Sequence, residues 1–106
     1  MQDLEELYKL VLERKNNPKK GSYTDYLYTK GLDKILKKVG EEATEVVVAA
    51  KNPDRNELIY ETADLLYHVM VLLAEQKVSY DEIKKELAKR EGLMSKTKDR
   101  PEITDL

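Results

Sequence analysis

The chain is organised around residues 34–68, which contain VGEEATEVVV at residues 39–48 and YETADLLYH at residues 60–68. Each segment holds two acids three positions apart: Glu42 and Glu45, then Glu61 and Asp64. On a helix, residues three apart share one face. Residues 46–60 leave room for one helix to end and the next to return antiparallel. A single pair of this kind usually lies on the solvent-exposed face of a helix. Two pairs on consecutive helices predict instead that four carboxylates meet between the helices.

Four carboxylates at one place repel one another, and burial makes each charge costlier. A divalent cation between them offsets both effects. The candidate ligands are all oxygen atoms, which favours Mg²⁺, with Mn²⁺ possible, over Zn²⁺. In a structural alternative the acids pair with Lys38, Lys51 and Arg55, but buried ion pairs add little stability. We therefore expect a metal site. Its predicted ligands are Glu42, Glu45, Glu61 and Asp64.

The composition limits the class of protein. Of the 106 residues, 38% are charged and 41% are hydrophobic, which predicts one helical domain over residues 1–106. The formal net charge of −2 gives no basic field for duplex nucleic acid. Cysteine is absent, which excludes disulfides and thiolate metal sites and suits a cytoplasmic location. We expect no membrane span, which needs roughly 20 apolar residues, and no signal peptide.

Apolar periodicity predicts four helices. Their expected ranges are 3–15, 32–51, 54–77 and 80–91. We expect these helices to form an all-α bundle of four to five antiparallel helices. In the last helix, Ile83, Leu87 and Ala88 are expected to face the bundle. Residues 92–106 show no periodicity and are expected to form an irregular tail.

Polar residues mark two of the helix starts. Asn52 is a suitable N-cap for the third helix, with Pro53 in its first turn. Ser79 and Glu82 fit a capping box at the fourth helix.

The third helix is apolar on nearly every side between Ala63 and Ala74, a pattern typical of a buried helix. Asp64 and His68 are polar exceptions within this run. His68 is the only histidine, so the chain lacks the two Glu-x-x-His units of a four-helix di-iron protein. A core histidine with a satisfied hydrogen bond is the commoner fate of such a residue. A substrate contact one turn from Asp64 is the alternative.

Residues 16–31 are expected to form a polar loop. Its aromatic and basic residues are Tyr23, Tyr26, Tyr28, Lys19, Lys20 and Lys30. Loops of this length are more often functional than plain connectors. Tyrosine rings can stack on a base and lysines can meet phosphate. Equally, the tyrosines can pin the loop to the bundle, and the sequence leaves both interpretations open.

Residues 20–91 resemble a known family. The matching segments are SYT at 22–24, KG at 30–31, KVGEEATEV at 38–46, AAK at 49–51 and ETADLLYH at 61–68. They look like the signature of the all-α nucleoside triphosphate pyrophosphohydrolases, the group that contains MazG and the dimeric dUTPases. The finer resemblance is to the phosphoribosyl-ATP pyrophosphohydrolases of histidine biosynthesis.

The resemblance implies a MazG-like fold and a magnesium-dependent hydrolase that cleaves phosphoribosyl-ATP between the α and β phosphates. The products would be phosphoribosyl-AMP and pyrophosphate. It also implies a helical homodimer with active sites near the subunit interface. A house-cleaning pyrophosphohydrolase that acts on ordinary or damaged nucleoside triphosphates is the alternative enzyme. A non-catalytic helical assembly or metal-binding module is the alternative from another class.

The resemblance also implies roles for individual residues. The catalytic set would be Glu41, Glu42, Glu45, Glu61 and Asp64. Within it, Glu41 would be an additional metal ligand or the base that orients the attacking water. The expected substrate contacts are Tyr23, Thr24, Lys38, Lys51 and His68. Of these, the two lysines would bind phosphates, although helix-surface lysines without a function are equally common.

Overall fold

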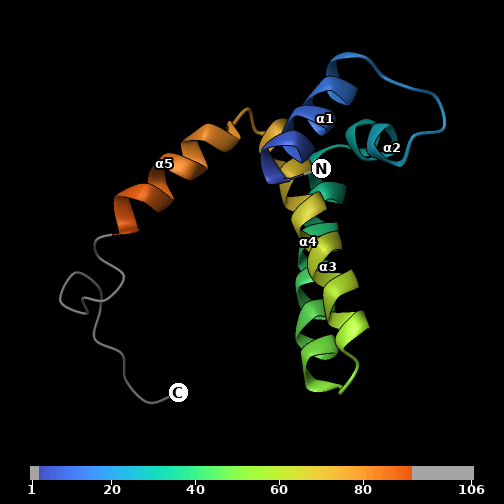
Figure 1. The fold of residues 1–106 in the computed structure, drawn as a ribbon. Helices are drawn as coiled ribbons and strands as arrows, with labels where there is room; N and C mark the ends of the chain where they lie inside the picture. The colour runs from blue at the N-terminus through green and yellow to red at the C-terminus, as the bar shows by residue number, and fades with distance from the viewer. Residues whose placement is uncertain (1–2, 92–106) are drawn as a thin grey trace.

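Five α-helices account for most of residues 3–91, the part of the chain that the structure, a computed structural model, describes (Figure 1). They are α1 (Leu4–Asn16), α2 (Tyr23–Lys30), α3 (Leu32–Lys51), α4 (Arg55–Glu75) and α5 (Tyr80–Glu91). Within this range there is no strand. The all-α helical bundle expected from the sequence is therefore confirmed. The tail expected over 92–106 lies outside the described residues.

The antiparallel hairpin of α3 and α4 forms the long axis of the molecule, and α1 and α2 cover one end of it (Figure 1). Between these four helices lies a single apolar core. Its buried members are Tyr8, Val11, Leu27, Ile35, Met70, Val71 and Ala74. Hydrogen bonds fasten the covering helices to each other: the Tyr28 hydroxyl donates to the carbonyl of Val11 at 2.7 Å. The core therefore holds α2 beside one end of the hairpin.

Helix α2 corrects the expectation that residues 16–31 form a loop. The side chain of Ser22 accepts a hydrogen bond from the backbone N–H of Asp25 at 3.3 Å and caps the start of the helix. Gly31 ends it with a φ of 93°, and its N–H donates to the carbonyl of Leu27 at 3.0 Å. Leu27 is the one residue of α2 that is fully buried. So short a helix shows almost no apolar periodicity in its sequence.

The start of α4 also differs from the expectation. Asp54, rather than Asn52, is the N-cap, and its carboxylate accepts from the N–H groups of Asn56 and Glu57 at 3.0 and 3.2 Å. Pro53 therefore lies before the helix. A carboxylate in this position also carries a negative charge beside the positive end of the helix dipole, which a neutral asparagine does not.

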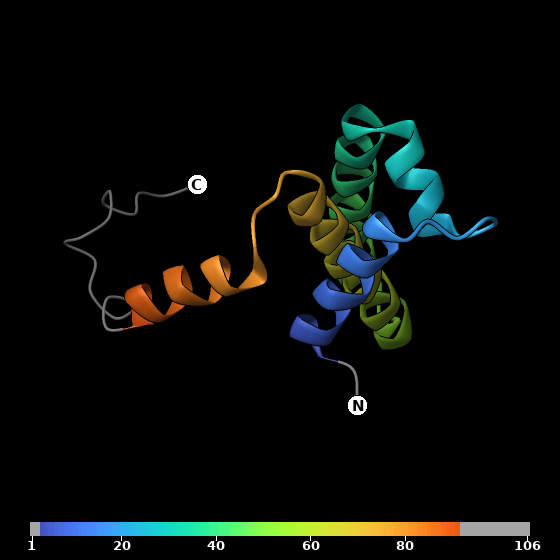
Figure 2. The same cartoon turned by 90° about the horizontal axis from the view of Figure 1, so that it is seen from above.

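Helix α5 projects away from the other helices and makes its main contact with α1 (Figures 1 and 2). The predicted capping box is confirmed: the N–H of Ser79 donates to the Glu82 carboxylate at 2.8 Å, and the N–H of Glu82 donates to the Ser79 hydroxyl at 3.1 Å. Ile83 is half-buried, as expected, but Leu87 and Ala88 are exposed, and the inward orientation expected for them is wrong. The reason is that the bundle does not extend along the outer turns of α5.

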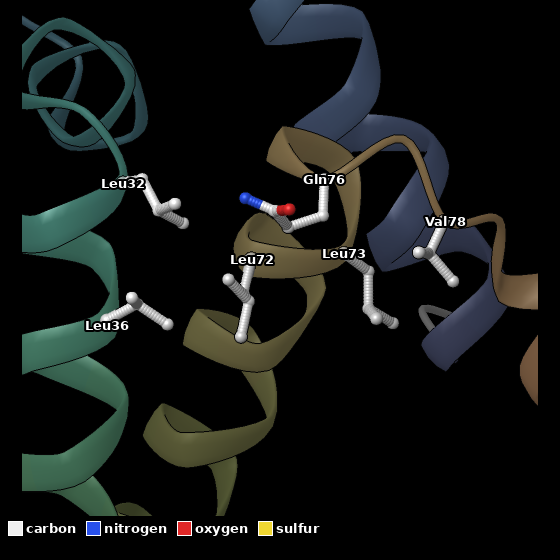
Figure 3. Close-up of a pocket in the computed structure, with 6 residues that line it drawn as sticks. All are labelled: Leu32, Leu36, Leu72, Leu73, Gln76 and Val78. Carbon is white, nitrogen blue, oxygen red and sulfur yellow. The ribbon is translucent and has the colours of Figure 1, made fainter.

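The apolar face of α3 is buried along only one edge. Ile35 and Ala49 are fully buried, whereas Leu36 and Val47 are 47% and 64% exposed. At the α2 end of the hairpin, the exposed edge borders an open apolar groove of about 490 Å³ (Figure 3). Its lining residues are Leu32, Leu36, Leu72, Leu73, Gln76 and Val78. Among the described helices, none is both long enough and apolar enough to span a membrane.

Candidate active site

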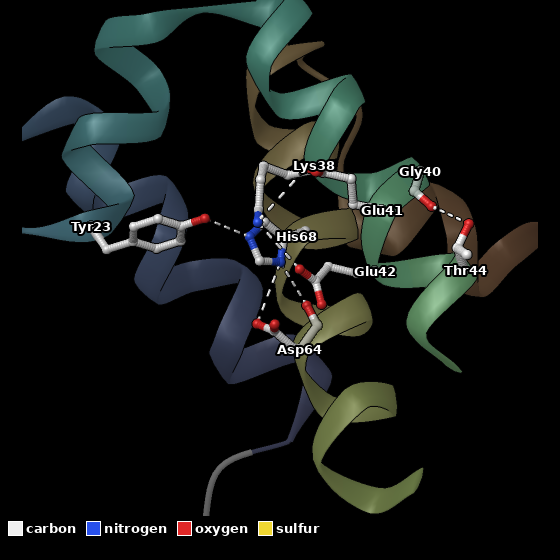
Figure 4. Close-up of polar contacts among 8 residues, drawn as sticks. All are labelled: Tyr23, Lys38, Gly40, Glu41, Glu42, Thr44, Asp64 and His68. Atoms are coloured by element: carbon white, nitrogen blue, oxygen red, sulfur yellow. Dashed lines mark hydrogen bonds and ion pairs between the residues drawn. The ribbon is translucent and has the colours of Figure 1, made fainter. Parts of the chain in front are cut away.

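An acidic side chain of α3 and two polar side chains of α4 converge where the two helices face each other. Glu42 comes from α3, and Asp64 and His68 come from α4, one turn apart. Each offers a ligand atom, and these atoms lie within 4.8 Å of one another (Figure 4). Glu42 is only 6% exposed because it follows Ile35 by seven residues and so shares its buried edge of α3. The site is therefore part of the helix packing.

Lys38 lies one turn before Glu42 on α3. Its Nζ atom is 3.3 Å from a carboxylate oxygen of Glu42 and 3.9 Å from one of Glu41. Burial alone would lower the pKa of Lys38, but its hydrogen bond to Glu42 and the nearby negative charges outweigh burial and raise that pKa. The lysine is therefore cationic and balances one of the negative charges at the site.

Glu42 and Asp64 shift each other's pKa across the helix interface. Burial is the largest influence on Glu42 and would raise its pKa, but hydrogen bonds from Asp64 and Lys38 lower it overall. Burial is also the largest influence on Asp64, and the hydrogen bond to Glu42 and the charge of Glu42 act in the same direction, so the pKa of Asp64 is raised. The two shifts are opposite in direction, as expected for two acids that interact over a short distance. Two acids this close favour a positive charge between them.

The other predicted acids lie around this pair rather than inside it. The pKa of Glu61 is raised, first by burial and then by the charges of Glu45 and Glu42. Glu45 and Glu41 are exposed and line an adjoining cavity of about 360 Å³ together with Thr44 and Val48. The structure therefore brings Glu42 and Asp64 together and leaves the remaining acids at the rim.

Three of the expected substrate contacts meet at the start of α2. The Tyr23 hydroxyl is 2.9 Å from Nε2 of His68, and the Thr24 hydroxyl forms a hydrogen bond with the hydroxyl of Tyr67 (Figure 4 shows the first). Tyr67 was not singled out as a site residue. The sequence signal that could have identified Tyr67 is its position next to His68 in a helix that was expected to be buried.

Lys51 is the expected site residue that lies apart. It is the exposed last residue of α3. Nine residues after Glu42, it is roughly 13 Å further along the helix axis. The structure therefore does not bring Lys51 to the carboxylate pair of its own chain.

Comparison with known proteins gives consistent results. The family model for phosphoribosyl-ATP pyrophosphohydrolase matches residues 4–91. The chain is 74% identical to the phosphoribosyl-ATP pyrophosphatase of Lactiplantibacillus plantarum and 76% identical to that of Limosilactobacillus fermentum, in both cases over all of each chain. It is 64% identical to the phosphoribosyl-ATP pyrophosphatase of Streptococcus sanguinis, over 94% of this chain and 96% of that one.

Proposed function

The chain belongs to the phosphoribosyl-ATP pyrophosphohydrolase family, and from this premise we propose how its residues hydrolyse phosphoribosyl-ATP to phosphoribosyl-AMP and pyrophosphate in histidine biosynthesis. The observation that carries the proposal is the buried Glu42, which faces Asp64 across the helix interface with ligand atoms within 4.8 Å. A helix interface gains nothing from two such acids unless they hold a cation.

The residues at this site fit a hard divalent cation. The two carboxylates face each other, and their oxygen atoms are ligands of the kind that Mg²⁺ and Mn²⁺ prefer. Glu42 and Asp64 would hold Mg²⁺ from the inside, with Glu45 and Glu61 completing the set from the rim. The ion would polarise the phosphoanhydride and increase the acidity of a bound water.

Each surrounding residue has a defined task in this proposal. Lys38 is cationic and exposed enough to reach a phosphate, so it neutralises charge on the departing pyrophosphate. Glu41 lies within 3.9 Å of Lys38 at the open rim, where it orients the attacking water and accepts its proton. Tyr23 and Thr24 contact the nucleoside part from α2. Lys51, far from the carboxylates, contacts only a remote part of the substrate or one bound to a second copy.

A homodimer accounts for the uncovered apolar residues of the hairpin. Val47, Val48, Ile59 and Tyr60 are all more than half exposed, at the end of α3 and the start of α4. Apolar residues gathered at one place on a small protein mark a contact surface, and two-fold symmetry is the commonest way to cover one. We further infer a cytoplasmic location, because the cysteine-free composition suits a reducing compartment.

A substrate panel tests the proposed function. Pyrophosphate release is measured from phosphoribosyl-ATP, dUTP, dCTP and ATP, each with and without Mg²⁺. We expect release from phosphoribosyl-ATP that depends on Mg²⁺ and exceeds release from the other three by at least tenfold. Equal or faster release from dUTP or dCTP would instead identify a house-cleaning enzyme. No release from any nucleotide would leave only the non-catalytic assembly.

A further inference from the structure

The side chain of His68 is buried between α2 and the carboxylate pair, with 1% of its surface exposed. Its Nδ1 is 2.8 Å from the backbone carbonyl oxygen of Asp64, and its Nε2 is 2.9 Å from the hydroxyl oxygen of Tyr23 (Figure 4). A carbonyl oxygen can only accept, so Nδ1 carries the hydrogen. In the neutral ring Nε2 is then an acceptor, and the Tyr23 hydroxyl donates to it.

This arrangement fixes what Tyr23 can offer to a ligand. Burial raises the pKa of the Tyr23 hydroxyl, so the group keeps its hydrogen, and that hydrogen is directed at His68. The lone pairs of the hydroxyl oxygen can then accept a further hydrogen bond. Tyr23 as a residue is 45% exposed, so it lies where a ligand can approach. Phosphate oxygens are also acceptors and cannot pair with these lone pairs, whereas a hydroxyl or amino group can.

A second hydrogen bond and several ring contacts also hold Tyr23 in place. Tyr23 and Thr24 are consecutive on α2, and their hydroxyls bond to His68 and Tyr67, which are consecutive on α4. The ring of Tyr67 meets the edge of His68 at a centroid distance of 5.0 Å and stacks on Tyr23 at 6.1 Å. Two adjacent hydrogen bonds and these ring contacts therefore fasten the first turn of α2 to α4.

We propose that His68 is a positioning residue that holds the Tyr23 hydroxyl as a hydrogen-bond acceptor for a hydroxyl or amino group of the nucleoside part of the substrate. The inference rests on the proposed function and deepens it. It revises the expectation that His68 touches the substrate directly. It also excludes His68 as a third metal ligand beside Glu42 and Asp64, although the three groups lie within 4.8 Å, because both of its nitrogens are engaged.

Four variants test this role: Tyr23→Phe, His68→Leu, their combination and His68→Gln. Loss of one hydrogen bond predicts that Tyr23→Phe and His68→Leu each raise KM for phosphoribosyl-ATP by about tenfold, with kcat changed by less than about threefold. The double variant should be no worse than either single one. His68→Gln, whose amide oxygen can still accept from Tyr23, should recover most of the affinity.

The matched control is Tyr26→Phe, which removes a tyrosine hydroxyl from the same helix, at a residue 41% exposed, and should leave KM unchanged. Mn²⁺ binding to the metal-free proteins, measured by calorimetry, separates the two roles of the histidine. We expect the same Mn²⁺ affinity for wild type and His68→Leu. A tenfold weaker Mn²⁺ affinity in that variant would instead make His68 a ligand and overturn the proposal.

Two further outcomes are decisive. If His68→Leu does not fold, Tyr23→Phe alone decides, because an unchanged KM in this variant overturns the proposal. If the effects of Tyr23→Phe and His68→Leu multiply in the double variant, the two residues act independently and the proposal is also wrong. If the wild-type protein releases no pyrophosphate from any nucleotide, the proposed function itself is wrong. If the wild type is active and Tyr23→Phe has an unchanged KM, only the role proposed for His68 is wrong.

Discussion

The two halves of the α3–α4 hairpin differ in what covers them. In the half next to α1 and α2, Ile35 and Val71 are fully buried. In the far half, Val47, Ile59 and Tyr60 are 64%, 57% and 68% exposed, although the same two helices carry them (Figure 1). Apolar residues on a helix therefore indicate that a face is buried against something. They do not identify the helix or the chain that covers it.

The candidate active site lies at the boundary between these halves. Tyr23, the first residue of α2, bonds to His68, so the cover given by α2 ends beside the carboxylate pair. On one side the core fixes the positions of Glu42 and Asp64. On the other, the open surface admits a ligand. The predictions below perturb the boundary, the covered half and the open half in turn.

Asp64→Asn at the boundary should have the largest effect. It removes one of the two inner carboxylates, so we expect kcat to fall by roughly two to three orders of magnitude, as for the loss of one preorganised electrostatic group. Helical circular dichroism should be unchanged, and so should the activity of the control Asp81→Asn, an exposed acid on α5. Near-wild-type turnover in Asp64→Asn would remove this residue from the metal site. Glu42→Gln is expected to behave in the same way.

Leu27→Ala tests the covered half. This side chain is fully buried, and its truncation should lower the free energy of unfolding by about 2–4 kcal/mol, measured by urea denaturation. The matched control is Leu87→Ala on α5, where the side chain is 59% exposed and the change should be within about 0.5 kcal/mol. Similar losses in both variants would mean that α5 is packed against something in solution.

Val47→Glu tests the open half. A buried carboxylate at a subunit contact should weaken self-association at least tenfold, or about 1.4 kcal/mol, and light scattering should show a shift from dimer to monomer. Lys37→Glu, an exposed residue on another side of α3, should leave the oligomeric state unchanged. A Val47→Glu protein that stays dimeric would place the interface elsewhere.

The pH dependence of stability should give the smallest effect. The pKa of Asp64 is raised in the folded chain, so its contribution to stability is present at low pH and is lost as pH rises through that pKa. Glu42 acts in the opposite direction, because its pKa is lowered. In metal-free protein, the Tm of Asp64→Asn relative to wild type should therefore rise with pH, by a few degrees. Saturating Mg²⁺ should stabilise wild type and remove this advantage. A constant difference in Tm between the two proteins would contradict the raised pKa of Asp64.

The sequence predicted the long helices well and the connections less well. The bounds of α3 were predicted as the structure has them, because its apolar residues recur over five turns. Helix α2 was missed, because one buried leucine gives no period. Its start and end were nevertheless marked by Ser22, Asp25 and Gly31, a cap and a terminating glycine that a search for periodicity alone passes over.

The structure brings together two of the acids that the sequence singled out, and their role as metal ligands stays a prediction. Two i, i+3 pairs on facing helices did predict that acids meet, and Glu42 and Asp64 do. The helical pattern places Glu42 at the edge of the apolar stripe and Glu45 further from it, but it did not show that Glu45 would be exposed. Their spacing from Ile35 was the usable signal, since only Glu42 follows it by seven residues. The pairing of Tyr23 with His68 joins segments far apart in the chain and had no local signal.

Gly31 carries a consequence for how this sequence can vary. Its φ of 93° is rarely adopted by other residues, yet a methyl group there would meet no atom within 4 Å. Replacement would thus leave packing undisturbed while changing the angle between α2 and α3, and with it the reach of Tyr23. Gly31 takes no part in the chemistry, but its backbone conformation sets the direction of α2 and so the position of Tyr23. Natural variants should therefore differ more often along the outer turns of α5 than at residue 31.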